Sequence, residues 1–266
     1  MPRASFLAIW RFFLIAGVYL IYTPVYWVLL KLHTPTGRRF GRYYLSTWRK
    51  CIGHQLIIKG KLSQIKPTIF VANHSSYVDI LILGTCIPAR FVAKKEVAEW
   101  PVMGWLATQQ GTIYIERKRT AIAEGAESLE GALEKGDSLI LFPEGTTSDG
   151  CHVLPFKSSF FDIAMKKNLV VQPISIAYAG WDRFSMPRVV RKQCGWFSPE
   201  IDLVAHLWEL AQLGTVQVVV ELHPPLKAKD FSSRKELAVA SFEAVQGGLI
   251  KAFASPLSTQ IGSLCH

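Results

Sequence analysis

Thr68-Ile-Phe-Val-Ala-Asn-His-Ser-Ser-Tyr-Val-Asp79 is the stretch of sequence that decides the fold. Residues 68–72 form a short apolar, β-branched run that predicts a buried strand, and a polar turn carrying Asn73 and His74 follows at once. Strands that pass through a turn into a helix are the building units of α/β folds, which gather their chemistry at the carboxyl ends of the strands. The stretch therefore predicts an α/β fold with a functional site around His74.

Similar apolar runs lie on both sides of this stretch. They predict six further strands, at residues 55–59, 90–93, 112–115, 138–142, 170–177 and 216–222. Helical patterns separate them, at residues 79–86, 122–133, 156–167, 201–212 and 234–253, and Gly136 is placed to end the second of these helices. We expect one α/β domain with a central, mostly parallel or mixed sheet of about seven strands, flanked by helices.

The amino-terminal region has the composition of a membrane anchor. From Phe12 to Leu30 there are nineteen residues without a charge, enough for a helix that approaches the roughly 30 Å thickness of the hydrocarbon layer. Pro24 and several interfacial aromatic residues leave a bent or re-entrant segment open as an alternative to a spanning helix. A cleaved signal peptide is excluded because the apolar run is too long and no small-residue cleavage site follows it. We expect a membrane anchor with a basic juxtamembrane segment at 1–50 and the catalytic domain at 51–266.

Charge and cysteine content indicate the compartment. The net charge is +10, and the basic residues that follow the apolar segment are more numerous than those before it; they are Lys31, Arg38, Arg39, Arg42, Arg49 and Lys50, against Arg3 and Arg11. This asymmetry places the catalytic domain on the cytoplasmic face of the membrane. The five cysteines have no CxxC spacing and cannot all pair, which fits reduced thiols.

His74 and Asp79 have a spacing that suits a general base and the residue that orients it. Side chains five residues apart on one regular helix diverge, so a contact requires His74 to lie before the helix and Asp79 on its first turn, with Ser75 and Ser76 capping the turn. A carboxylate on one imidazole nitrogen leaves the other free to accept a proton. The spacing alone is weak evidence, since a turn histidine and an acidic residue in a first helical turn are common.

Three further segments follow in order, each at the end of an expected strand: Gly111-Thr-Ile-Tyr-Ile-Glu-Arg117, Phe142-Pro-Glu-Gly-Thr-Thr-Ser148 and Val171-Gln-Pro-Ile-Ser175. Together with Asn73-His-Ser-Ser-Tyr-Val-Asp79 they resemble the four ordered motifs of the glycerolipid acyltransferases, the family of 1-acylglycerol-3-phosphate acyltransferases, over about residues 65–180. The signatures of serine hydrolases, P-loop enzymes and zinc proteases are absent from the sequence, and no metal site is expected.

The resemblance implies the roles of the site residues. His74 and Asp79 would be the catalytic pair, and Arg117, Glu144, Gly145 and Thr146 would hold the polar head of the acceptor. It also implies transfer of a fatty acyl group from acyl-CoA or an acyl carrier protein to the hydroxyl of 1-acylglycerol-3-phosphate (lysophosphatidic acid), with no cofactor beyond that acyl donor. Backbone N–H groups near Gly145 could stabilise the tetrahedral oxyanion.

Thr147 departs from the motif, which commonly has Arg at this position, so a phosphate headgroup loses an expected cation. The continuation 148–157 and the stretch 202–208 resemble the branch that includes lyso-ornithine lipid acyltransferases, which makes lyso-ornithine lipid the alternative acceptor. His206 and Trp208, within 202–208, are interpreted as one face of a helix.

Two other classes of function are weighed against the enzyme. A non-catalytic membrane protein that binds lipid on the same fold would not need the intact pair His74 and Asp79. A nucleic-acid-binding protein is disfavoured because the basic residues follow a membrane-like segment and no nucleic-acid-binding module is recognised. The expected partners are therefore membrane lipid, a lysolipid acceptor and an acyl thioester, and no nucleic acid.

Overall fold

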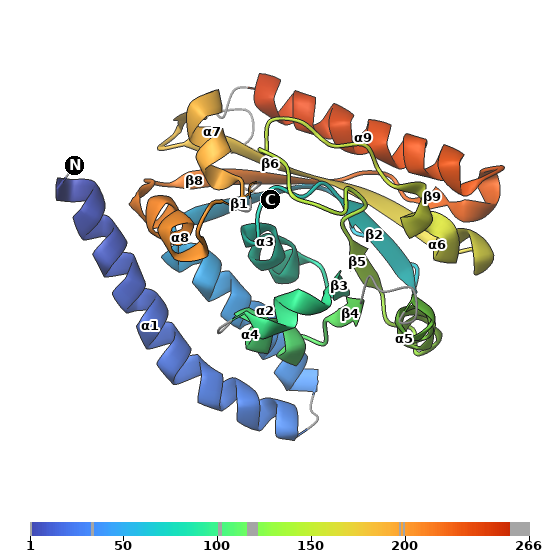
Figure 1. The fold of residues 1–266 in the computed structure, drawn as a ribbon, viewed down its shortest axis with the longest axis horizontal. Helices are drawn as coiled ribbons and strands as arrows, with labels where there is room; N and C mark the ends of the chain where they lie inside the picture. The colour runs from blue at the N-terminus through green and yellow to red at the C-terminus, as the bar shows by residue number, and fades with distance from the viewer. Residues whose placement is uncertain are drawn as a thin grey trace.

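The computed structural model describes residues 2–32, 35–100, 103–115, 122–196, 198 and 200–255. Its helices of seven residues or more are α1 (Pro2–Lys31), α2 (Pro35–Cys51), α3 (Val78–Cys86), α4 (Met103–Gln109), α5 (Ile122–Glu134), α7 (Arg188–Cys194), α8 (Leu203–Gln212) and α9 (Arg234–Ala254). Shorter turns are η1 (Lys95–Glu99), η2 (Ser158–Phe161), α6 (Asp162–Lys166) and η3 (Ala228–Asp230). The arrangement is a sheet between two layers of helices (Figure 1).

The sheet runs through the centre of the molecule. Its main strands are β1 (His54–Gly60), β2 (Thr68–Ala72), β3 (Arg90–Lys94), β4 (Ile113–Ile115), β5 (Leu139–Leu141), β6 (Val170–Trp181) and β8 (Val216–Leu222), in the order β1-β8-β6-β2-β5-β3-β4. Two short strands, β7 (Phe184–Ser185) and β9 (Leu226–Lys227), pair with β6. All neighbouring main strands are parallel except β6 and β8, so β1 and β8 run against the rest. The expected mixed sheet is confirmed.

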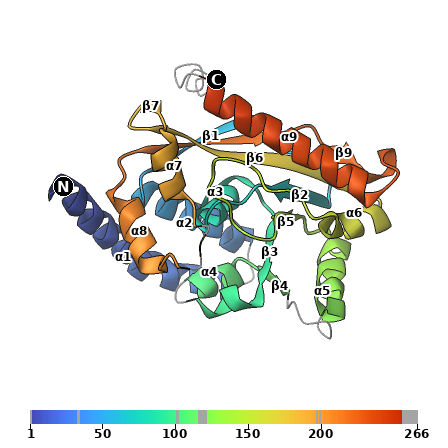
Figure 2. The same ribbon diagram turned by 45° about the horizontal axis from the view of Figure 1, so that its top comes forward.

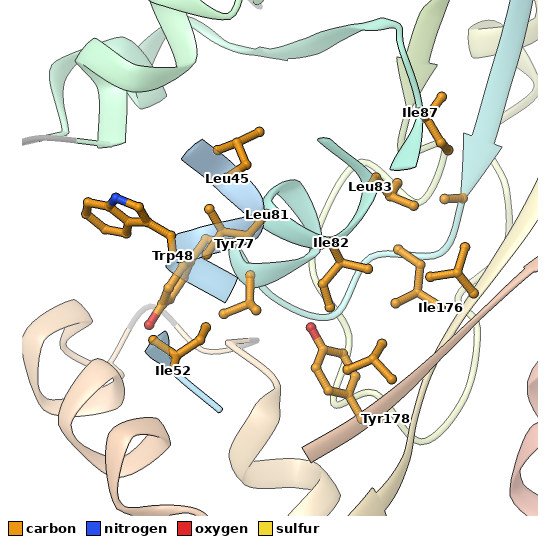
Figure 3. Packing of buried hydrophobic residues seen from close by; sticks show 14 of the residues in the cluster. Leu45, Trp48, Ile52, Tyr77, Leu81, Ile82, Leu83, Ile87, Ile176 and Tyr178 are labelled. Atoms are coloured by element: carbon orange, nitrogen blue, oxygen red, sulfur yellow. The ribbon is translucent and has the colours of Figure 1, made fainter. Parts of the chain in front are cut away.

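Apolar side chains leave the sheet on both faces. On one face Ile174, Ile176 and Tyr178 of β6 pack with residues of α2 and α3, as the close-up shows for Ile176 and Tyr178 (Figure 3). On the other face α5, the η2–α6 segment and α9 cover β2, β5 and β6. Figure 2 shows α9 lying along the sheet on the side opposite α1 and α2. The alternation of β6 side chains between two cores follows from the two-residue period of a strand.

Most expected elements are present, with shifted ends. Two of the seven strands, β2 and β8, have their predicted bounds, and the other five lie within four residues of theirs. Gly136, with a φ of +80°, follows α5 in the left-handed conformation expected of a helix-ending glycine. The helix expected at 156–167 is wrong in its first half, where the chain forms η2 before the short α6. The helices α2, α4 and α7 were not predicted. The chain around α2 was interpreted as a basic juxtamembrane segment.

The amino-terminal helix lies along the α/β domain. The continuous helix α1 includes Pro24 and contacts α2 and α8. Among the described residues, α1 and α9 are the two helices long and apolar enough to cross a membrane, and α9 lies against the sheet. The helix α2 ends at Cys51 and contributes to the core beneath α3, so the predicted boundary at residue 50 falls inside a packed element.

Candidate active site

His74 lies in the turn between β2 and α3, at the carboxyl end of the strand, as the sequence predicted. Its Nδ1 is 2.9 Å from Asp79 Oδ2, and its ring stacks on Phe142 with the ring centres 4.0 Å apart. The side chain is 18% exposed, whereas that of Asp79 is fully buried. Two contacts therefore fix the imidazole plane, and Nε2 is the nitrogen that points away from Asp79.

Asp79 organises the turn as well as the histidine. Its Oδ2 accepts hydrogen bonds from the backbone N–H groups of Ser75 and Ser76 at 2.7 and 2.9 Å, and its Oδ1 accepts one from the Tyr178 hydroxyl at 2.7 Å. Two backbone donors thus converge on the oxygen that also faces His74, and the Tyr178 hydroxyl binds the other oxygen. The capping expected of the Ser75 and Ser76 side chains is largely provided instead by the Asp79 carboxylate, and Ser76 Oγ adds a 3.3 Å contact to the N–H of Val78.

Asn73 ties the same turn to β6. Its side-chain amide donates to the Ile176 carbonyl oxygen at 2.9 Å, and its Oδ1 accepts from the Ile176 N–H at 2.8 Å. A two-point contact of this kind fixes both the position and the direction of a side chain. The residue before the histidine is therefore held to the central strand of the sheet.

Glu144 is buried behind the histidine loop. It is 2% exposed, and its two carboxylate oxygens accept hydrogen bonds from the N–H groups of His74 and Leu154 at 2.7 and 3.0 Å. Burial raises the pKa of Glu144 to about 8, an effect larger than the opposing effect of the two N–H donors. The side chain braces two loops, and an acceptor hydroxyl would have to reach a nearly inaccessible carboxylate.

Gly145 and Thr146 form the tip of the turn after β5. Gly145 has a φ of +68°, a backbone conformation that favours glycine, and a Cβ there would lie 2.7 Å from Nζ at the flexible end of Lys157. Its N–H donates to the Phe142 carbonyl oxygen at 3.0 Å and so holds the turn instead of facing an oxyanion. Thr146 is exposed. Lys157, for which no role was predicted, places a cation over this turn.

Arg117 lies outside the described residues, so its expected contact with the acceptor stays a prediction. Thr147 lies in the described turn, and its hydroxyl donates a hydrogen bond to the Trp196 carbonyl oxygen. The N–H of Trp196 in turn donates to the Ser75 carbonyl oxygen at 2.8 Å. Thr147 and Trp196 therefore connect the two loops of the site.

A small apolar cavity lies beside α3. Its walls come from α2, α3, β3, η1 and α4, and include Leu45, Tyr77, Ile80, Leu81, Trp100 and Leu106. Trp100 packs edge-on against Trp196, with the ring centres 5.1 Å apart. The cavity thus begins next to the aromatic residues that adjoin the histidine loop.

Other sequence expectations concern residues around the site. His206 is 2% exposed and contacts the Tyr77 hydroxyl through Nδ1 at 3.1 Å, while Trp208 stacks on Phe12. Both lie on α8, as expected, but two residues apart they point to different sides of the helix instead of sharing one face. The four cysteines that lie within the described residues, Cys51, Cys86, Cys151 and Cys194, are unpaired. Cys265 falls outside that part of the chain.

Several residues of the site were not predicted. Tyr178, Phe142, Lys157 and Trp196 contact the turn residues from sequence distances that no local pattern encodes. The alternation of Ile174, Ile176 and Tyr178 along β6 was the one available signal, since it places Tyr178 on the same face as the residues that pack on α3.

Comparison with known proteins agrees with this geometry. The acyltransferase family model matches residues 55–177. The chain is similar to two proteins named lyso-ornithine lipid O-acyltransferase: one from Brucella abortus, 33% identical over 81% of this chain and 83% of that protein, and one from Rhodobacter capsulatus, 40% identical over 74% and 71%. The fold is similar to the crystal structure of the 1-acyl-sn-glycerophosphate acyltransferase PlsC from Thermotoga maritima, with a TM-score of 0.71 at 23% identity over 96% of this chain and 98% of that one.

Proposed function

Because the chain belongs to the acyltransferase family, we propose that it is an enzyme that moves a fatty acyl group from a thioester to a lysolipid hydroxyl, with His74 as the general base. The observation that carries the proposal is the 2.9 Å contact between His74 Nδ1 and Asp79 Oδ2 at the carboxyl end of β2. Asp79 orients the imidazole and favours the tautomer with hydrogen on Nδ1. The lone pair on Nε2 is then available for a proton.

The proposed reaction needs no acyl-enzyme. His74 Nε2 accepts the proton of the acceptor hydroxyl as its oxygen bonds to the thioester carbonyl carbon. The resulting tetrahedral oxyanion re-forms the carbonyl, the carbon–sulfur bond breaks, and the leaving thiolate takes the proton back from the imidazolium. Products are the ester and the free thiol. The Gly145 amide is engaged in its turn, so the donors to the oxyanion must come from other groups at this edge.

We propose lyso-ornithine lipid as the acceptor. Relatives with that name are similar to the chain over 74–81% of its length. Thr147, at the position where the related motif commonly carries a phosphate-binding Arg, uses its hydroxyl to hold Trp196. Lyso-ornithine lipid offers a hydroxyl on an acyl amino acid and has no phosphate. A site for this acceptor therefore does not need an Arg at position 147.

The second candidate acceptor is 1-acylglycerol-3-phosphate, which the four ordered motifs first suggested. Lys157 favours it or any other acidic head, because its ammonium group lies over the Gly145 turn. An ammonium is a point charge that can pair with either phosphate or carboxylate, so Lys157 by itself does not distinguish the two acceptors.

The proposed acyl donor is acyl-CoA or an acyl carrier protein, and the apolar side chains around the small cavity beside α3 are a surface against which its hydrocarbon chain can pack. Burial of each methylene group in such a cavity contributes about 0.8 kcal/mol. A series of thioesters of increasing chain length, on each carrier, measures both preferences in one assay. A rate that rises with chain length is expected if the acyl chain packs against these apolar side chains.

Membrane attachment through α1 brings the site to both lipid substrates. We further propose that the catalytic domain faces the cytoplasm, because basic residues are more numerous after the apolar segment than before it. Protease digestion of sealed cytoplasmic-side-out and cytoplasmic-side-in vesicles tests this orientation. Cleavage within the domain is expected only in the first kind.

The test of function is acyl transfer from a labelled thioester to lyso-ornithine lipid, lysophosphatidic acid and lysophosphatidylcholine. Membranes containing the wild-type chain are compared with His74→Ala. Loss of the general base should reduce turnover by about 10² or more on the preferred acceptor. His152→Ala is the matched control, because this histidine is exposed and pairs with Asp149 instead.

Each outcome decides a separate point. Transfer to lysophosphatidic acid in preference to lyso-ornithine lipid contradicts the acceptor but retains the reaction. Near-normal turnover in His74→Ala contradicts the base. Absence of transfer to every acceptor by the folded wild-type chain supports a lipid-binding protein without activity.

A further inference from the structure

Tyr178 reaches the Asp79 carboxylate from the middle of the sheet. It lies on β6, 99 residues along the chain from Asp79, and its hydroxyl is 2.7 Å from Asp79 Oδ1. The close-up shows this hydroxyl directed toward α3 (Figure 3). Tyr178 is 1% exposed and Asp79 is fully buried, so the contact is shielded from water.

The Asp79 carboxylate divides its hydrogen bonds unequally between its two oxygens. Oδ2 accepts from the Ser75 and Ser76 amides and faces His74 Nδ1. Among the described residues, Tyr178 is the hydrogen-bond donor to Oδ1. A buried carboxylate oxygen without a donor is strongly disfavoured, so Tyr178 completes the set of hydrogen bonds to the buried Asp79 carboxylate.

The tyrosine keeps its proton throughout the working pH range. Burial first, and then the charge of Asp79 and the hydrogen bond to it, raise the pKa of Tyr178 well above its ordinary value. The hydroxyl is therefore a constant donor to Oδ1. Donation to one oxygen draws negative charge away from the other, which is the oxygen that holds His74.

The same strand also holds the loop that carries the histidine. Asn73 forms its two hydrogen bonds with Ile176, two residues before Tyr178 on the same face of β6. The strand lies between β8 and β2, and the pairing register with β8 shifts just after Tyr178. Strand β6 is thus a common support for the loop before the base and for the acid that orients it.

We propose that Tyr178 is a positioning residue for the reaction, acting through Asp79 to fix the orientation and proton affinity of His74. This inference rests on the proposed role of the His74–Asp79 pair. It assigns a function to a residue outside the four sequence motifs. Tyr178 would touch neither the acceptor nor the thioester.

Other titratable groups face this contact from several elements. They are His54 at the start of β1, Tyr77 before α3, Cys194 at the end of α7 and Glu144 after β5. Burial lowers the pKa of His54 to about 3 and raises that of Cys194 to about 12, and it raises the pKa of Tyr77 above its ordinary value. Glu144, near 8, titrates on the alkaline side of neutrality. The acid limb of a pH profile is therefore the part to measure.

Tyr178→Phe removes the hydroxyl and keeps the ring. We expect kcat to fall about tenfold with KM for both substrates changed less than about twofold, because one hydrogen bond to a charged group contributes on this scale. The acid limb of the kcat profile should move to higher pH. With Oδ1 no longer bound, more charge returns to Oδ2 and holds the proton on His74 more tightly.

Tyr44→Phe is the matched control. Tyr44 is equally buried, but its hydroxyl lies 2.7 Å from Thr23 Oγ1 of α1 instead of bonding to Asp79. The Tyr44→Phe variant should lose about as much thermal stability as Tyr178→Phe and keep the wild-type pH profile of kcat. If Tyr178→Phe also retains the wild-type kcat and acid limb, Tyr178 is only a packing residue and the inference is overturned.

A double-mutant cycle with Asp79→Asn tests the route through Asp79. Each rate is divided by the amount of folded protein, so that a variant that folds poorly can still be compared. If Tyr178 acts through Asp79, Tyr178→Phe should change kcat by less than about twofold in the Asp79→Asn background. An undiminished effect there contradicts the route through Asp79. His74→Ala in the same assay separates the two proposals, since activity that depends on His74 but is insensitive to Tyr178→Phe overturns only this one.

Discussion

At the scale of single residues, Glu144 shows how a motif residue can act without touching substrate. Its two oxygens join the N–H groups of His74 and Leu154, which lie on different loops. A glutamine in its place presents an amide NH₂ to one of those N–H donors, whichever way it is oriented. The two acceptor oxygens of Glu144 are therefore matched to the two N–H groups that face each other across the gap between the loops.

Glu144→Gln should lower the free energy of unfolding by about 1–3 kcal/mol at pH 5, the range for a buried hydrogen bond that is lost. The folded-state pKa of Glu144 near 8 exceeds its ordinary value, so the folded state binds the extra proton between about 4.5 and 8. The contribution of Glu144 to the free energy of unfolding of the wild type is complete below about pH 4.5 and is lost as the pH rises through 8. The difference between the proteins should consequently shrink toward pH 9.

Thermal unfolding in detergent between pH 5 and pH 9 measures this difference. Glu236→Gln is a control, because Glu236 is an exposed residue at the start of α9. A gap between wild type and Glu144→Gln that stays constant over the whole range would contradict the assigned ionisation.

At the scale of elements, Arg11 fastens α1 to the catalytic domain. Its guanidinium donates to the carbonyl oxygens of Ala211, Leu213 and Gly214, at the end of α8 and just after it. The last carbonyls of a helix lack intrahelical partners and carry its partial negative charge. One buried cation in an apolar helix thus satisfies groups some 200 residues away in the sequence.

Arg11→Met keeps the apolar stem and removes the donors. We expect the free energy of unfolding to fall by about 1–3 kcal/mol, because buried carbonyl oxygens lose their partners. Limited proteolysis should also cut the loop after α8 faster. Arg3→Met is the control, since Arg3 is exposed on the same helix; equal behaviour of the two variants would show that Arg11 does not fasten α1.

At the scale of the whole molecule, α1 has a buried side and a long exposed apolar side. Ala8, Arg11, Ile15 and Tyr26 face the domain. The outer side includes Phe6, Trp10, Phe13, Leu20, Ile21 and Trp27, which are 51–71% exposed. An apolar face of this extent is typical of contact with lipid, and the packing of its other side holds α1 along the domain.

Membrane attachment should therefore depend on this outer side. Trp10→Ser with Phe13→Ser should shift the protein from membranes to the soluble fraction in flotation with vesicles that contain anionic lipid. The wild-type protein should resist a high-salt wash and be released by detergent. Val239→Ser with Ile250→Ser is the matched control, because these side chains are also exposed but belong to α9, on the side of the sheet opposite α1. Release of the wild-type protein by salt alone would contradict the anchor.

The sequence by itself determined the features that repeat over a few residues. The two-residue period located the main strands, the helical period with Gly136 located α5, and the spacing of His74 to Asp79 required the turn that is found. Ordered motifs identified the family. Short helices such as α4 and α7 were not predicted, because seven residues contain too few turns to show a clear helical period. The helix α2 escaped because its basic side chains were attributed to the membrane surface, although Arg49 is buried.

Only the tertiary structure decided which distant groups complete the site. Tyr178 reaches Asp79 because the sheet places β6 beside β2, and Trp196 joins Ser75 to Thr147 because the chain returns after α7. Local patterns state which face of an element is apolar, but the order of strands determines what that face meets. The choice of His74 as base was therefore readable from the sequence, whereas the support that holds its partner Asp79 became visible only in the fold.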